Sequence, residues 1–206
     1  MTKTIGGLEL PREVYSVTAA GHLMRASQLR MQFVKINPMQ FGLYATLELR
    51  NAIERLLFEY LVVIHGEGVS KKMEKEYRAL GLRKRIESVE PDLETKIRFT
   101  NLMLQAVGYP PAVVPDLDLL CELYSRLNDY LHAWKRPETT AQQQAWWTEM
   151  WQTLDKTEKY LTLILSGTIS HCKFTNDGYK QYEAWKNGDI RDDDVVESFR
   201  RELESS

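Results

Sequence analysis

Two polar residues on one predicted helix, Asn128 and His132, have the types and the spacing that proton transfer requires. They stand four residues apart in a helix expected from Pro115 to Trp134, so they share its boundary between apolar and charged faces. The unperturbed pKa of histidine is near neutrality, so His132 could act as a general acid or base beside Asn128. A histidine with a purely structural role would show the same pattern.

A second pair, Arg50 and Glu54, lies one turn apart in an apolar helix expected from Asn37 to His65. Both residues fall on or beside the apolar stripe of that helix, where charged side chains are unusual. If this helix packs against the one that carries His132, Arg50 could hold a phosphate or another anion, with Glu54 orienting it. The other interpretation is a buried polar network that holds the two helices in register.

The segment LYSRLNDYLHAW resembles the signature helix of the HEPN superfamily, whose all-α domains carry an Arg, four to six intervening residues and a His. In this sequence those residues are Arg126 and His132. The segment LELRNAIERLLFEYL is similar to a preceding long helix in several such families, where an Arg and a Glu stand one turn apart, as Arg50 and Glu54 do. The resemblance covers these two helices.

This resemblance implies a metal-independent endoribonuclease, often a toxin or an antiviral defence protein, whose homodimer brings two motifs to one cleft. The RNA 2′-hydroxyl would attack the adjacent phosphodiester, with His132 as acid or base, Arg126 as phosphate clamp and Asn128 orienting His132 or the substrate. It also implies RNA or a nucleotide as the ligand and a protein partner such as an antitoxin.

The surroundings of Arg126 leave a second explanation open. The residue after the motif arginine is often polar in the superfamily, whereas here it is Leu127. An ideal helix also places Arg126 and His132 about 120° apart around its axis. Glu122 and Asp129 lie about one turn on either side of Arg126, so a surface ion-pair ladder explains this arginine equally well. The sequence leaves open which arginine is functional.

Helical periodicity runs through nearly the whole chain, and no segment shows sustained alternation, so the sequence predicts an all-α fold. We expect a single-domain, HEPN-like helical bundle over residues 1–187 and an acidic helical tail over residues 188–206. The bundle would be built on three long helices near residues 37–65, 115–134 and 140–170. Other helices are expected near residues 11–35, 70–80, 92–107, 177–187 and 193–204.

Composition excludes several other classes of protein. Hydrophobic residues make up 43% of the 206 residues and charged residues 27%, as in ordinary soluble globular proteins. No apolar run resembles a signal peptide, so we expect a cytoplasmic protein. Cys121 and Cys172 are isolated and the four histidines are scattered, so we expect no disulfide framework, metal site or cofactor. The sequence contains no Gly-rich phosphate loop, HExxH motif or nucleophile elbow.

The charge distribution and the tryptophans indicate which kinds of partner the protein could bind. The formal net charge of −2 argues against a surface built wholly for nucleic acid. Residues 187–206 carry seven acids and three bases, which gives a net charge of −4 and leaves +2 for the rest of the chain.

The apolar circumference of several helices, with Trp146, Trp147 and Trp151, favours a homodimer, although tryptophans at helical spacing also form cores. The alternative function is therefore a non-catalytic protein-interaction or dimerisation module.

Overall fold

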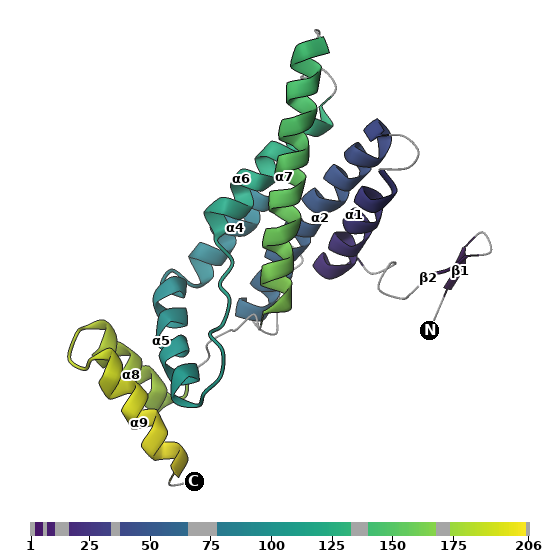
Figure 1. Ribbon diagram of the computed structural model, residues 1–206. Coiled ribbons are helices and arrows are strands. Elements are labelled where there is room, and N and C mark those ends of the chain that lie inside the picture. The colour runs from purple at the N-terminus through teal and green to yellow at the C-terminus, as the bar shows by residue number, and fades with distance from the viewer. Residues whose placement is uncertain are drawn as a thin grey trace. The chain divides into compact units, whose positions relative to one another are not determined.

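The computed structural model describes residues 3–5, 8–10, 17–33, 38–65, 78–132, 140–167 and 174–204. These residues form α-helices almost throughout (Figure 1), so the all-α prediction is confirmed. One short antiparallel hairpin, in which β1 (Lys3–Ile5) pairs with β2 (Leu8–Leu10), was not expected. Strands of three residues are too short to show the alternation that identifies a strand in a sequence.

The structure has a helix in each of the three places where the sequence predicts a long one, although the second of them, with 15 residues, is shorter than expected. Those three are α2 (Pro38–His65), α6 (Leu117–Leu131) and α7 (Thr140–Ser166). The others are α1 (Ala19–Phe33), α4 (Ala79–Val89), α5 (Leu93–Ala106), α8 (Asn176–Lys186) and α9 (Asp192–Glu204). Most of the helix expected near residues 70–80, and Cys172, lie outside the described residues. In the ranges that the structure describes, no helix combines the length and the apolarity needed to cross a membrane.

Local signals determine where several helices begin and end. Asp116 precedes α6 in an extended conformation, and its carboxylate accepts a hydrogen bond from the backbone N–H of Leu119 at 2.9 Å. After α5, Gly108 takes a positive φ of 74°, which allows the N–H of Tyr109 to donate to the carbonyl of Leu104 at 2.9 Å. Gly188 closes α8 with a φ of 84°. These bonds satisfy backbone groups that a helix end would otherwise leave without partners.

The chain divides into two compact units, each with its own buried residues. The first comprises residues 1–86 and 115–166, and in it α1, α6 and α7 all pack against α2. The helix at its centre, α2, is almost entirely apolar on its buried side and supplies more buried hydrophobic side chains to this core than any other single helix. Fully buried side chains of α2 include Leu49, Ile53, Leu56, Leu57 and Leu61.

The second unit comprises residues 87–114 and 167–206. Its helices α5, α8 and α9 surround an aromatic cluster formed by Phe99, Phe174, Tyr182, Trp185 and Phe199. The helix expected to be a separate acidic tail, α9, contributes Val195 and Phe199 to this core. Contacts therefore group residues 188–206 with residues 87–114 and 167–187, whereas the sequence placed a boundary after residue 187.

The three clustered tryptophans are partly buried and make contacts within the first unit. The rings of Trp146 and Tyr130 meet edge to face at 5.4 Å between centroids. Gly42 of α2 lies so close to Trp147 and Trp151 that an added Cβ would come within 3.5 and 3.7 Å of their rings. Packing within one chain therefore explains these tryptophan contacts, and the homodimer stays a prediction.

Candidate functional site

The Arg50 and Glu54 side chains form a closed polar ring with Tyr124, which reaches them from α6. Arg50 Nη2 lies 3.2 Å from Glu54 Oε1 and 3.2 Å from the Tyr124 hydroxyl. That hydroxyl donates to Glu54 Oε1 at 2.8 Å, and the guanidinium carbon lies 5.3 Å from the centre of the tyrosine ring. The pair predicted on α2 therefore exists and joins α2 to α6. Tyr124 was not identified from the sequence as a member of this cluster.

This ring lies at the edge of the core and keeps its charges. The Arg50 and Glu54 side chains are 23% and 16% exposed, and Arg50 Nε is buried with no hydrogen-bond partner. Burial lowers the pKa of Arg50, but the hydrogen bond with Tyr124 and the charge of Glu54 outweigh it and hold the pKa above its ordinary value. Burial raises the pKa of Tyr124, so its hydroxyl stays protonated and can donate.

His132 is held at the C-terminal end of α6 by the amide one turn before it. Asn128 Nδ2 lies 3.2 Å from His132 Nε2, so the pair is where the sequence predicts it. The Asn128 amide nitrogen donates this hydrogen bond, so His132 Nε2 is the acceptor. In the neutral ring the proton is therefore on Nδ1, an assignment that follows from the hydrogen bond. His132 caps the helix in an extended conformation and is half-buried, so its ring is held at a helix end.

Arg126 stands on a different side of α6. Its guanidinium pairs with Glu122 at 3.1 Å, and both side chains are about half exposed. The α6 helix runs without interruption from Leu117 to Leu131, so the rotation of about 120° between Arg126 and His132 is retained. Within one chain, the structure does not bring these two motif residues to the same face.

Three residues of α6 form a line that connects the two candidate clusters. Tyr124, Asn128 and His132 follow one another at intervals of four residues, and we call this line the α6 strip. Arg50 and Glu54 meet the strip at Tyr124, while His132 ends it. At a rise of 1.5 Å per residue, the two ends are about 12 Å apart along the helix axis. Arg50, which contacts the strip at Tyr124, and His132, at the other end of the strip, can thus contact two separate groups of one extended ligand.

A further polar cluster joins α1 to α2, and sequence reasoning missed it. Glu48 Oε2 lies 2.7 Å from His22 Nδ1 and 3.0 Å from Arg25 Nε, while Arg25 Nη2 lies 2.6 Å from the same His22 nitrogen. Burial raises the pKa of Glu48, but the hydrogen bond from His22 and the charge of Arg25 outweigh it and hold the pKa below its ordinary value. The sequence places Glu48 opposite the apolar stripe, where it reads as solvent-exposed.

The lowered pKa of Glu48 predicts a specific dependence of stability on pH. A carboxylate with a lowered pKa in the folded state contributes its full stability above its ordinary value of 4.5 and loses it as the pH falls below that value. Glu48→Gln should therefore lower the free energy of unfolding by about 1 to 2 kcal/mol at pH 7. The difference between parent and variant should shrink as the pH falls below 4.5, as urea unfolding at several pH values would show.

The control for this experiment is Glu122→Gln, which removes an exposed ion pair and should change stability by less than about 0.5 kcal/mol. A Glu48→Gln variant as stable as the parent at pH 7 would contradict a stabilising role for the Glu48 ion pairs.

Cys121 is buried in α6 and is not part of a disulfide. Among the residues whose positions are described, no group of three or more His, Cys, Asp and Glu side chains could hold a metal ion.

Comparison of this chain with protein-family models, with curated proteins and with solved structures found no match.

Proposed function

We propose that this protein is a HEPN-like RNA-cleaving protein in which His132 is the acid or base and Arg50 binds phosphate. The observation that carries the proposal is the contact of 3.2 Å between Asn128 and His132, because it fixes the ring of a titratable group at a helix end. The HEPN resemblance supplies the reaction class, in which the RNA 2′-hydroxyl attacks the adjacent phosphodiester. A toxin or defence role in the cytoplasm belongs to this proposal through that resemblance.

The spacing along the α6 strip supports separate tasks for the two residues. His132 would act on the scissile phosphodiester, whereas Arg50, which meets the strip at Tyr124, about 12 Å from His132 along the α6 axis, would bind a phosphate further along the strand. Glu54 and Tyr124 would orient the Arg50 guanidinium. A homodimer could supply Arg126 to the His132 of the second copy, because the Arg126 ion pair is exposed and therefore weak.

The central test is RNA cleavage by the His132→Gln variant. Purified protein is incubated with total RNA in the presence of a chelator, and the fragments are examined for cyclic phosphate ends. Loss of a general acid or base should reduce the rate by about 100-fold or more, while the circular dichroism spectrum stays unchanged. The matched control is His65→Gln, which replaces an exposed histidine at the end of α2 and should keep full activity.

Two results would count against this function. The first is a parent protein that leaves RNA intact, and the second is equal cleavage by the parent and His132→Gln. Arg126→Gln then decides the composition of the site: unchanged cleavage points to Arg50 alone, whereas lost cleavage points to a site completed by a second copy.

A non-catalytic protein-interaction or dimerisation module is the second candidate function. The observation that favours it is the pairing of both candidate arginines: Arg50 with Glu54 and Tyr124, and Arg126 with Glu122. An arginine that must bind phosphate would first have to leave its carboxylate partner. This function predicts a parent that cleaves no RNA and sediments as a dimer or in a complex.

A further inference from the structure

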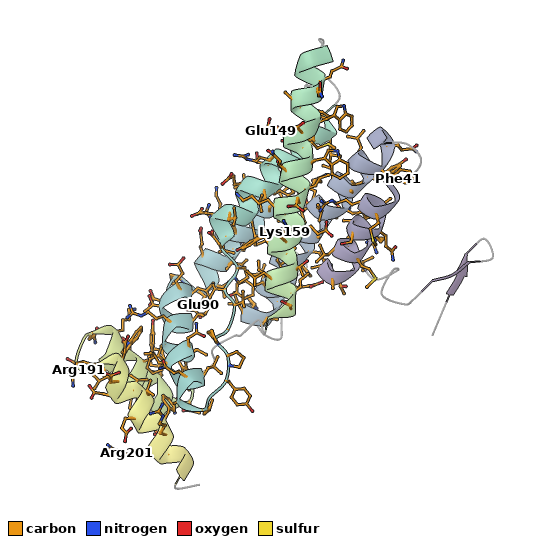
Figure 2. The ribbon with its side chains drawn as sticks, viewed as in Figure 1. Phe41, Glu90, Glu149, Lys159, Arg191 and Arg201 are labelled. Carbon is orange, nitrogen blue, oxygen red and sulfur yellow. The ribbon has the colours of Figure 1, made fainter. Side chains whose placement is uncertain are left out.

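A concave site separate from the α6 strip lies between α1 and α7 in the first unit. Its volume is about 780 Å³, which is within the range of small-molecule sites. Met31 and Trp151 supply apolar surface, and the side chain of Arg30 lies over the Trp151 ring at 5.7 Å from its centre. Lys159, labelled in Figure 2, belongs to the C-terminal half of α7 and also lines the site.

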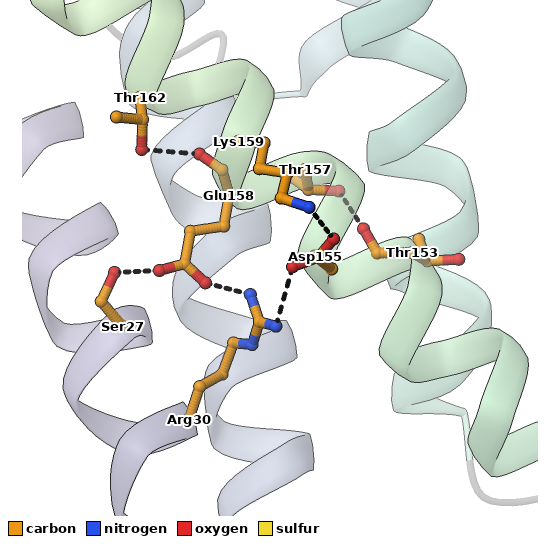
Figure 3. Close-up of polar contacts among 8 residues, drawn as sticks. All are labelled: Ser27, Arg30, Thr153, Asp155, Thr157, Glu158, Lys159 and Thr162. Atoms are coloured by element: carbon orange, nitrogen blue, oxygen red, sulfur yellow. Dashed lines mark hydrogen bonds and ion pairs between the residues drawn. The ribbon is translucent and has the colours of Figure 1, made fainter.

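Two acids and two bases form a connected network in this site (Figure 3). Glu158 accepts a hydrogen bond from the Ser27 hydroxyl and forms an ion pair with Arg30. Arg30 Nη2 also pairs with Asp155 Oδ1 at 3.3 Å, and Lys159 Nζ pairs with Asp155 Oδ2 at 2.7 Å. The formal charges of the network therefore cancel.

The network has a fixed inner part and an accessible outer part. Arg30 and Glu158 are only 20% and 23% exposed, whereas Lys159 and Asp155 are 76% and 46% exposed. An exposed ion pair contributes little stability, so a ligand can separate Lys159 from Asp155 at small cost. The hydrogen bond from Lys159 holds the pKa of Asp155 below its ordinary value, so this carboxylate is ionised at neutral pH.

The charge of the ligand follows from the neutrality of the network. An anion alone would take Lys159 and give Asp155, which still pairs with Arg30, no new partner, and a cation alone would take Asp155 and leave Lys159 to solvent. A zwitterion gives each member a new partner, because its carboxylate binds the ammonium and its ammonium binds the carboxylate. The indole of Trp151 and the exposed thioether of Met31 provide an apolar surface beside these charges.

We propose that this site binds a small amphipathic zwitterion, namely an amino acid with an aromatic or aliphatic side chain. The α-carboxylate pairs with Lys159, the α-ammonium pairs with Asp155, and the apolar side chain lies against Trp151. Arg30, Glu158 and Ser27 form the fixed floor of the site. This binding activity is independent of RNA cleavage at His132.

Isothermal titration with three related probes tests the charge requirement. The probes are L-phenylalanine, 2-phenylethylamine and 3-phenylpropanoate, which share the ring and differ in their charged groups. Phenylalanine should bind saturably at neutral pH, and each of the other two should bind at least about tenfold more weakly, because each lacks one charge-assisted hydrogen bond. Equal affinity for all three probes, or no heat of binding with phenylalanine, would overturn the proposal.

A pair of lysine variants tests the position of the site. Lys159→Gln removes the exposed ammonium and should weaken phenylalanine binding by about tenfold. The matched control is Lys156→Gln, an exposed lysine of the same helix that does not line the site, and it should bind as the parent does. Because both lysines are exposed, both variants should keep the parent's circular dichroism spectrum. Equal affinities of the two variants would place the binding elsewhere and overturn the proposal.

Discussion

Replacing Phe99 by Ala is expected to lower the free energy of unfolding by about 3 to 5 kcal/mol, the largest effect among the substitutions considered for this chain. Phe99 is completely buried in the second unit. Its ring contacts those of Phe174, Tyr182 and Trp185, with centroids 5.3, 5.6 and 5.4 Å away. The substitution would leave a cavity between α5 and the rings of α8 and the segment before it, and packed elements of this kind close only partly around a cavity. Urea unfolding followed by circular dichroism would measure the loss.

The control in the same unit is Tyr109→Ala, since Tyr109 follows α5 and is 66% exposed. This variant should differ from the parent by no more than about 0.5 kcal/mol. If Phe99→Ala were as stable as Tyr109→Ala, the aromatic cluster would not be the core of the second unit.

Arg50→Met is expected to lower the free energy of unfolding by about 2 to 3 kcal/mol, because it leaves the Glu54 carboxylate largely buried without its cation. The loss should be smaller than for a fully buried pair, since the Tyr124 hydroxyl still donates to Glu54 at 2.8 Å. Replacing both members, Arg50→Met with Glu54→Leu, should recover much of the stability, because two apolar side chains leave no charge unpaired.

A second ion pair of α2 provides the control for this experiment. Arg55 and Glu59 have the same spacing on the same helix, but their side chains are more exposed, so Arg55→Met should cost less than about 0.5 kcal/mol. The prediction is wrong if the double variant is as unstable as Arg50→Met alone. In a folded double variant, RNA cleavage would also show whether the Arg50 charge contributes to function.

Local interactions explain which features the sequence was able to predict. Helix periodicity and pairs of residues four apart depend on backbone geometry within one or two turns. The Arg50 and Glu54 pair and the Asn128 and His132 pair are of this kind, and both contacts are present. The rotation between Arg126 and His132 follows from the same geometry.

Contacts between distant segments could not be predicted in this way, because they depend on how the helices pack. Tyr124 lies 70 residues from Glu54, and its helical spacing from apolar residues of α6 identifies it only as a residue of the apolar face. Ser27 and Glu158 are 131 residues apart, so nothing in either segment indicates the network between α1 and α7. Only the tertiary structure decided these partners, because each pair forms only when burial of apolar surface brings its two helices together.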